Sequence, residues 1–136
     1  MGNLAIQLAL HGSIVLTVSL ISGLFLYADI LKKKNEAAWH LSHAGGSARG
    51  IMLIALAAVI HLPVLPFWQL STLVWLIIFF TWTSTLVMII AAFSGERGLR
   101  FSGSITNKVV YVLYGVGVIV VFPAFLLLIF GLLNAL

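Results

Sequence analysis

Long apolar runs occupy most of the sequence, at residues 8–31, 44–62, 70–93 and 109–136. Each run provides close to the roughly 20 residues of helix needed to cross a hydrocarbon core about 30 Å thick. No stretch outside the runs is long enough to form a second, water-soluble domain. The pattern therefore predicts an all-α fold, an integral membrane four-helix bundle that forms a single domain over residues 1–136.

Short polar segments and prolines separate these runs. The segment 32–36, with three lysines, ends the first run, Pro63 and Pro66 follow the second, and the segment 94–98 ends the third. We do not expect the first run to be a cleaved signal peptide. It has no basic segment before it, and a lysine cluster rather than a small-residue cleavage site follows it.

Lysine and arginine gather in two of the three connecting segments. Lys32 to Lys34 follow the first run, and Arg97, Arg100 and Lys108 lie between the third run and the fourth. The segment 61–69 and the terminal residues contain none. Because basic loops stay on the cytoplasmic side, we expect loops one and three in the cytoplasm. Both termini should then lie on the non-cytoplasmic side of a bacterial inner (cytoplasmic) membrane.

Composition supports this assignment and excludes several kinds of chemistry. Hydrophobic residues make up 62% of the chain and charged residues 7%, against about 25% charged residues in soluble domains. The net charge of +4 is consistent with basic loops on the cytoplasmic side and with contact with anionic lipid. We therefore expect a lipid bilayer, and no nucleic acid, as the partner. The chain has no cysteine, which excludes thiol catalysis, disulfides, cysteine-held iron–sulfur clusters and thiolate-ligated haem.

The four histidines are the first candidates for metal binding. His40 and His43 are three residues apart, so on a helix they would share a face and could form a ligand pair. No carboxylate nearby offers a third ligand, which makes two solvated histidines the favoured interpretation over a zinc site. His11 and His61 lie near the outer ends of the first two runs and could form a bis-histidine site. Two separate interfacial histidines remain the simpler interpretation.

Haem needs only one proximal histidine, and small residues follow His43. Gly46 and Gly50 fall four residues apart, a spacing that gives a small-residue face on a helix. We favour close helix packing as the role of this face. A flat surface for a haem macrocycle is the alternative.

Arg49 is a charged residue within the second run. An arginine in a span costs on the order of 2.5–3.5 kcal/mol on insertion scales unless it is paired or reaches the interface. One interpretation is an ion pair with Asp29, near the end of the first run. The other is binding of an anionic group, such as a haem propionate or a developing oxyanion. A helix turns about 600° over six residues, so Arg49 should not project from the same face as His43.

In the third run, Thr81, Ser84, Thr85 and Met88 form one helical stripe. Hydroxyl groups in such a stripe more often connect helices than contact a substrate. Ser84 and Thr85 are nevertheless kept as weak candidates for catalytic residues, together with Arg49.

Several segments together resemble a known family. The segment 39–45 (WHLSHAG) followed by 50–52 (GIM) resembles the second helix of the styrene oxide isomerases, which share a superfamily with the hydroxylaminobenzene mutases. His11-Gly12 in the first run, Trp82 in the third and the segment 97–101 (RGLRF) fall in the same order as in that family. Each motif alone has little specificity, but their joint order covers most of the chain.

The resemblance implies subunits of four helices that assemble as trimers, with haem b between neighbouring protomers. It implies that His43 is the axial ligand of the haem iron, which acts as a Lewis acid without net redox change. The reaction would convert an epoxide to an aldehyde or, in the mutases, an arylhydroxylamine to an aminophenol. The candidate cofactor-binding residues are His43, Gly46, Arg49, Gly50 and Trp82.

The sequence departs from the family pattern at residues that would position a substrate. Arg49 and Ser84 stand where asparagines are expected, and a tyrosine expected near Met88 is missing. The leading hypothesis is a haem-dependent intramolecular isomerase or mutase acting on a small lipophilic aromatic substrate. A non-enzymatic haem-binding or electron-transfer protein is the alternative. A small multidrug-type transporter is less favoured, since it would need an embedded carboxylate and the first run offers only Asp29.

Overall fold

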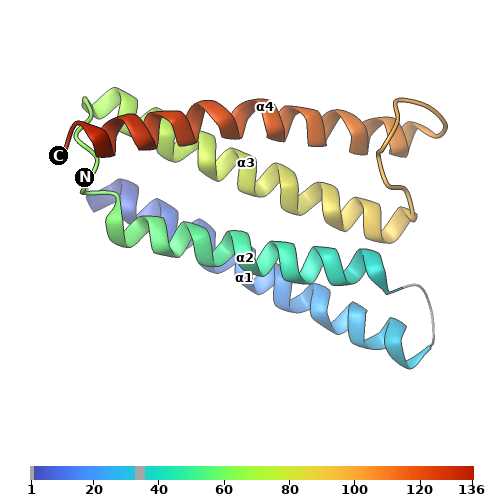
Figure 1. Ribbon diagram of the computed structural model, residues 1–136. Helices are drawn as coiled ribbons and strands as arrows, with labels where there is room; N and C mark the ends of the chain where they lie inside the picture. The colour runs from blue at the N-terminus through green and yellow to red at the C-terminus, as the bar shows by residue number, and fades with distance from the viewer. Residues whose placement is uncertain (1, 33–35) are drawn as a thin grey trace.

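The protein is described by a computed structural model, which covers residues 2–32 and 36–136. The described chain contains four helices, α1 (Gly2–Leu31), α2 (Ala37–Val59), α3 (Phe67–Ser94) and α4 (Ile105–Leu133). The helices run alongside one another as one elongated bundle (Figure 1). The predicted all-α fold with four helices is confirmed.

The helices differ in length from the apolar runs that predicted them. α1 begins at Gly2, α2 at Ala37 and α4 at Ile105, all earlier than the runs at 8, 44 and 109. Backbone hydrogen bonds of a helix form whether its side chains are apolar or polar, so the runs mark the apolar part of each helix and not its ends. α2 ends at Val59, before the expected residue 62. The residue before a proline is disfavoured in a helix, and here Leu62 precedes Pro63.

Three of the helices, α1, α3 and α4, are long and apolar enough to cross a membrane. α2 is long enough but is not among them. Its first half carries His40, His43 and Arg49 among glycines and serines, which makes this helix less apolar than the others. The expectation of four membrane-spanning helices is therefore supported by length and composition for three of them.

α1 and α2 approach each other through small residues. A Cβ atom placed on Gly50 would lie 2.9 Å from the carbonyl oxygen of Gly12, and one placed on Gly12 would lie 2.8 Å from that of Gly50. One turn earlier on α2, a Cβ on Gly46 would lie 3.0 Å from the Cβ of Ser19. No larger residue fits at this crossing without displacing a helix, so the small-residue face of α2 serves close helix packing, as we favoured.

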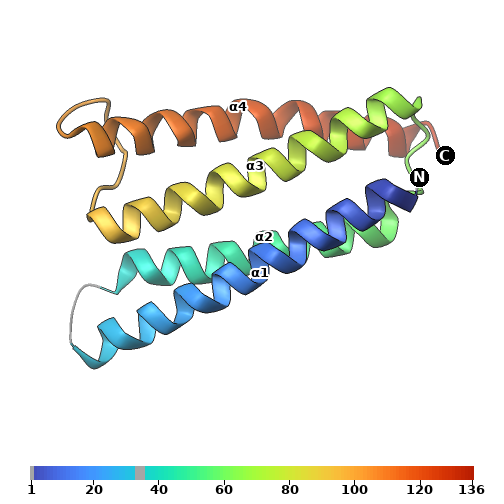
Figure 2. The ribbon, with the colours of Figure 1, turned by 180° about the vertical axis from the view of Figure 1, so that it is seen from behind.

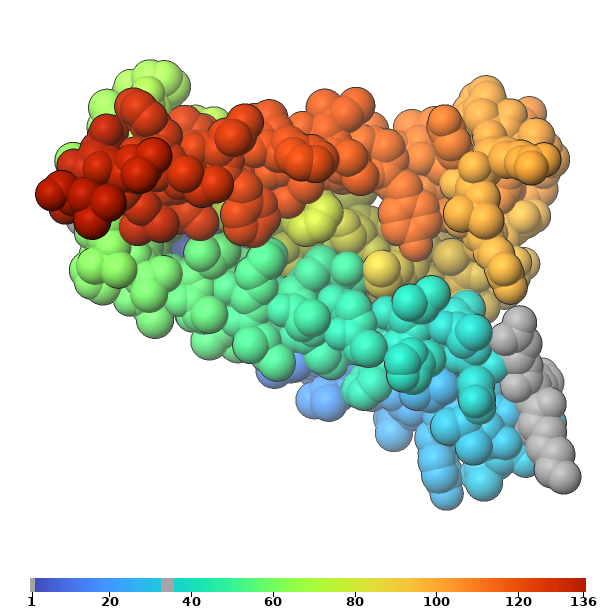
Figure 3. All heavy atoms as spheres, viewed as in Figure 1, coloured from blue at the N-terminus to red at the C-terminus, as the bar shows by residue number. Residues whose placement is uncertain are grey.

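α3 is the central helix of the bundle. It packs against α1, α2 and α4, whereas among the described helices no Cα atom of α4 lies within 8 Å of one in α1 or α2. Its buried side chains include Leu73, Val74 and Ile77. Because the Cα atoms of α2 and α4 stay more than 8 Å apart, part of α3 is visible between the two helices (Figure 3).

Both termini lie at one end of the bundle, and the C-terminal end of α1, which Lys32 follows, lies at the other end, together with the segment that joins α3 to α4 (Figures 1 and 2). That segment carries Arg97 and Arg100. Lys33 and Lys34, which also led us to expect a cytoplasmic loop, lie outside the described residues. The described basic segments thus share one end of the bundle, and the termini share the opposite end.

The glycine crossing gives a first prediction, which compares two helical glycines. Gly50→Ala should lower the thermal unfolding temperature in detergent, because overpacking of a close contact typically costs about 1–3 kcal/mol. Gly115→Ala is the matched control on α4, where nothing lies within 4 Å of the added methyl group. It should leave the unfolding temperature unchanged or raise it, since alanine favours helix by about 1 kcal/mol over glycine. Equal effects of the two substitutions would contradict the close contact.

Candidate functional site

His43 lies on the face of α2 that packs against α1. Its Nδ1 atom is 2.8 Å from the carbonyl oxygen of Ser19. A carbonyl oxygen only accepts, so Nδ1 carries the proton and donates, which leaves the lone pair of the neutral imidazole on Nε2. Gly23 makes room for the ring, since a Cβ atom there would lie 3.0 Å from Nδ1.

The other ring nitrogen of His43 is free to act as a ligand. Nε2 makes no hydrogen bond within the part of the chain that the structure describes, and it is not among the enclosed polar atoms that lack a partner. It therefore reaches the surface of the bundle. A histidine whose second nitrogen donates to a backbone carbonyl has the usual arrangement of a metal ligand, with ring orientation and tautomer both fixed. His43 thus fits the role of a single axial ligand.

Serine side chains hold α1 and α2 together at this level. Ser19 donates through Oγ to the carbonyl oxygen of His43, and the same Oγ lies 2.7 Å from Oγ of Ser47. Ser42 donates to Ser22 over 3.1 Å. Sequence reasoning missed these bonds, although serines at helical spacing on both runs were a signal for them.

Gly46 and Gly50 are used in the contact with α1. The face that a macrocycle would need at these two residues is therefore occupied within the same chain. Their predicted role in cofactor binding is not supported by this position. The packing interpretation accounts for both glycines.

The remaining histidines lie in other surroundings. His11 accepts a hydrogen bond at Nδ1 from Nε1 of Trp82 over 3.0 Å, and its ring meets Trp75 and Trp82 edge-on, with centroids 6.1 and 6.2 Å apart. His40 and His61 are exposed. No three of the described histidine, aspartate and glutamate residues gather as a metal site, which leaves the zinc alternative without a third ligand. Trp82, a predicted cofactor contact, is engaged with His11.

Arg49 points away from the side of α2 that carries His43. Its Nη2 donates to Sδ of Met88 on α3 over 2.9 Å, and the guanidinium lies along Gly45, one turn back on α2. The face predicted from helical rotation is therefore confirmed. Nε is buried without a hydrogen-bond partner. In the described chain Arg49 makes no ion pair with Asp29, so the first of the two interpretations of this arginine does not hold.

The hydroxyl stripe on α3 lies inside the helix packing. Thr81, Ser84 and Thr85 are all buried. Ser84 faces α4, where a Cβ atom on Gly117 would lie 3.5 Å from its Oγ. Neither Ser84 nor Thr85 lines the cavity described next. A direct role for them in catalysis stays a prediction.

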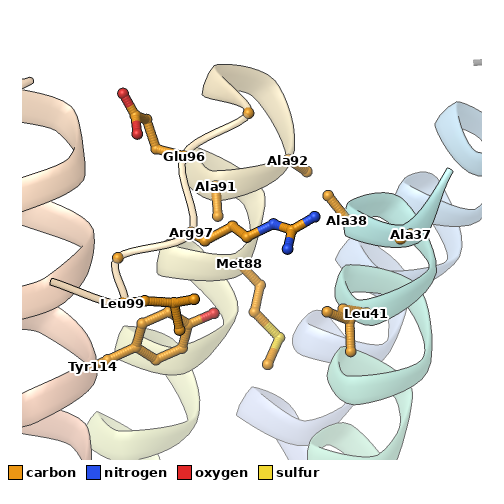
Figure 4. A pocket seen from close by; sticks show the side chains of 12 residues that line it. Ala37, Ala38, Leu41, Met88, Ala91, Ala92, Glu96, Arg97, Leu99 and Tyr114 are labelled. Atoms are coloured by element: carbon orange, nitrogen blue, oxygen red, sulfur yellow. The ribbon is translucent and has the colours of Figure 1, made fainter. Parts of the chain in front are cut away.

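A cavity of about 880 Å³ opens at the end of the bundle that carries the basic segments. It lies between α2, α3 and α4, under the segment that follows α3 (Figure 4). Met88, the partner of Arg49, is part of its wall, as is Tyr114 of α4. The separation of α2 from α4 leaves this space, which sequence reasoning did not predict.

The segment over the cavity is ordered by Asn107, in the first turn of α4. Its Oδ1 accepts from the backbone N–H of Gly98 over 2.9 Å. Its Nδ2 donates to the carbonyl oxygens of Arg100 and Ser102, both over 2.8 Å. Sequence reasoning missed Asn107, because a single asparagine near a predicted helix start does not reveal which backbone groups it will meet.

The sequence profile of the styrene oxide isomerase family matches residues 4–133, nearly the whole chain. The chain belongs to the styrene oxide isomerase family. The match includes His43 and the segment 97–101, and it confirms the resemblance seen in the sequence. A search among curated proteins returned no match. Arg49, one of the residues that set this sequence apart from the resemblance, contacts Met88 in the structure.

The segment over the cavity gives a second prediction, which uses two glycines with positive φ. Gly98 has φ +60° and Gly103 has φ +77°, so alanine at either position is strained by about 1–2 kcal/mol. A Cβ atom on Gly98 would also clash with Cγ1 of Val110, whereas nothing lies within 4 Å of one on Gly103. Gly98→Ala should therefore lower the thermal unfolding temperature more than Gly103→Ala. A larger loss in Gly103→Ala would show that the segment does not pack on α4 in this way.

Proposed function

We propose that the protein is a membrane-embedded isomerase that uses haem b to rearrange a small lipophilic aromatic substrate. The reaction would convert an epoxide to an aldehyde or an arylhydroxylamine to an aminophenol. Membership of the styrene oxide isomerase family supports an isomerase-type membrane protein. The observation that carries the haem proposal is the fixed tautomer of His43, which presents Nε2 at the surface of the bundle.

His43 would hold the cofactor through Nε2. Haem b would supply a ferric iron that acts as a Lewis acid on the substrate oxygen, so that rearrangement needs no net redox change. The hydrogen bond from Nδ1 to the carbonyl oxygen of Ser19 would keep the ring oriented and make Nε2 a stronger donor to the metal. The apolar surfaces of the helices would exclude water and admit a substrate dissolved in lipid.

The position of Nε2 also supports an assembly of several copies. Gly46 and Gly50 are already packed on α1 and cannot also cover a macrocycle. A macrocycle bound at the surface of α2 would therefore be covered by this chain on only one of its two sides. A neighbouring protomer would cover the other side. We therefore propose a homo-oligomer, and a trimer in keeping with the family resemblance.

A non-enzymatic haem protein is the second candidate. It is favoured by one contact, that of Arg49 with Met88, since the resemblance implies an asparagine at the position of Arg49 and a tyrosine near Met88, both of which would position a substrate. Turnover of styrene oxide or phenylhydroxylamine by the haem-loaded protein separates the two candidates. A loaded protein without turnover of either substrate would favour the second.

The third prediction concerns the axial ligand. His43→Ala should abolish the Soret band of the detergent-purified protein, because no other side chain would replace Nε2 at that position. His43→Gly should regain a Soret band when imidazole is added, since the free ring can occupy the space left by the side chain. His40→Ala, three residues away on the same helix, is the matched control and should keep the wild-type spectrum, as should His11→Ala and His61→Ala.

An unchanged spectrum in His43→Ala would overturn the ligand assignment. Loss of the band in His40→Ala with an intact band in His43→Ala would move the ligand to the exposed histidine.

The fourth prediction concerns the orientation in a bacterial inner membrane, with α2 as the fourth span. The natural chain has no cysteine, so any labelling of the protein comes from the single cysteine that is introduced. Asn134→Cys, at the end of the bundle with the termini, should react with a membrane-impermeant maleimide in intact cells whose outer membrane is permeabilised. Ser102→Cys, an exposed residue of the segment between α3 and α4, should react only after the inner membrane is broken. The reverse pattern would invert the orientation, and labelling of both would contradict a membrane-spanning α4, the helix that separates the two residues.

A further inference from the structure

A groove runs along the first turns of α4, at the end of the bundle that carries the basic segments. Its volume is about 250 Å³. Phe101, in the segment after α3, lines the groove together with residues of α4, namely Ile105, Lys108, Val109, Val112 and Leu113. The groove shares no lining residue with the cavity between α2, α3 and α4, so the two are separate features of the molecule.

This groove faces the outside of the bundle. Phe101, Ile105, Val109 and Val112 are exposed although their side chains are apolar. Among the described helices, only α3 has Cα atoms within 8 Å of α4. Because α4 is long and apolar enough to cross a membrane, the outer face that carries the groove would border lipid.

The position of the groove along α4 matches the boundary between lipid headgroups and hydrocarbon. α4 has 29 residues, which is about 43 Å of helix, and the hydrocarbon core is about 30 Å thick. A centred, upright α4 would therefore extend about 6 Å beyond the core at each end. Lys108 lies about 4.5 Å along the axis from the first residue of α4, at headgroup level, whereas Leu113 lies about 12 Å along it, within the core. The groove thus leads from headgroups into hydrocarbon.

Hydrogen bonds hold Phe101 in place as a wall of the groove. Nδ2 of Asn107 donates to the carbonyl oxygens of Arg100 and Ser102, both over 2.8 Å, so the backbone is held on each side of Phe101. The ring of Phe101 also lies against that of Tyr111, with centroids 5.8 Å apart. A wall that is already ordered loses little further freedom when a ligand binds, which favours binding.

Lys108 supplies a positive charge at the groove. Its Nζ atom lies 5.8 Å from the centroid of the Phe101 ring, within the range of about 6 Å for cation–π contacts. In the described chain Lys108 makes no ion pair, and the carboxylate of Glu96 accepts a hydrogen bond from Ser104. An unpaired ammonium group beside an apolar groove is complementary to an anionic head joined to an apolar chain.

We propose that this groove binds an anionic phospholipid, with an acyl chain along α4 and the phosphate beside the ammonium group of Lys108. An ammonium group has three N–H donors and binds phosphate oxygens through charge-assisted hydrogen bonds. One lysine near a membrane surface typically strengthens binding of anionic lipid about fivefold. The bound lipid would contact Phe101 and so connect the membrane to the segment after α3. The proposal goes beyond the isomerase function and depends on neither haem nor substrate.

The test measures lipid binding to the purified protein by native mass spectrometry from a neutral detergent. The probes are phosphatidylglycerol and phosphatidylcholine with identical acyl chains. The wild type should bind phosphatidylglycerol saturably, one molecule per protomer, and about fivefold more tightly than phosphatidylcholine. Glycerol phosphate, which lacks acyl chains, should not compete, because it cannot fill the apolar groove. Equal affinities for the two lipids, or displacement of the lipid by glycerol phosphate, would overturn the proposal.

Two lysine variants locate the anionic head. Lys108→Gln should weaken binding of phosphatidylglycerol by about fivefold and leave binding of phosphatidylcholine unchanged. Lys32→Gln is the matched control, because Lys32 is exposed, does not line the groove and directly follows α1, which ends at the same end of the bundle (Figure 1). It should keep wild-type affinity for both lipids.

Two variants of exposed apolar residues locate the acyl chain. Phe101→Ala should weaken binding of both lipids by about fivefold, because it removes one apolar wall of the groove. Leu99→Ala is the matched control, since Leu99 is an exposed apolar residue of the same segment that does not line the groove. It should bind both lipids as the wild type does. Lys108 is exposed, so its variant tests the proposal even if Phe101→Ala disturbs the segment.

Three results would overturn the proposal. An equal loss of phosphatidylglycerol binding in Lys32→Gln and Lys108→Gln would reduce the effect to general surface charge. An equal loss in Leu99→Ala and Phe101→Ala would remove the groove as the place of the acyl chain. A wild type that binds no phosphatidylglycerol, with an oligomer that dissociates in Phe101→Ala, would assign the groove to a contact between copies of the chain.

Discussion

The close approach of α1 and α2 determines most of what the rest of the structure can do. Within lipid, helices gain nothing from leaving an apolar solvent, so packing and interhelical hydrogen bonds must hold them together. Gly12 and Gly50 bring the two backbones near enough for this. The same approach places the carbonyl oxygen of Ser19 within 2.8 Å of Nδ1 of His43, which fixes the tautomer of the proposed ligand. A wider crossing would break this bond and leave the imidazole without orientation.

One face of α2 packs against α1. Helical rotation then determines on which sides of α2 its other polar residues lie. Arg49 comes to the side of α3, where Met88 is its acceptor, and the separation of α4 from α2 leaves a cavity beside them. One helix thereby carries a candidate metal ligand on one side and a half-buried arginine on the other. The two sites can be tested separately for this reason.

Features of the sequence that are local were predictable, and features that depend on helix neighbours were not. Apolar runs predicted the helices, and the rotation between His43 and Arg49 followed from helix geometry. Sequence alone did not reveal which residue would accept from Arg49, since Met88 is 39 residues away and helix order in a bundle is not encoded in periodicity. Asn107 was missed for the same reason, because its partners are backbone groups of a segment without regular structure.

The hydrogen bonds that α2 makes with α1 account for its more polar composition. α2 is not among the helices that are apolar enough to cross a membrane. Several of its polar groups, however, form hydrogen bonds with α1. Ser42 donates to Ser22, and the carbonyl oxygen and ring of His43 both bond to Ser19. An unsatisfied polar group in hydrocarbon costs several kcal/mol, so these bonds to α1 lower the cost that the polar groups of α2 would have in a membrane. The two helices therefore form one packed unit, in which Ser19 orients the ring of His43 while the side chain stays only partly buried.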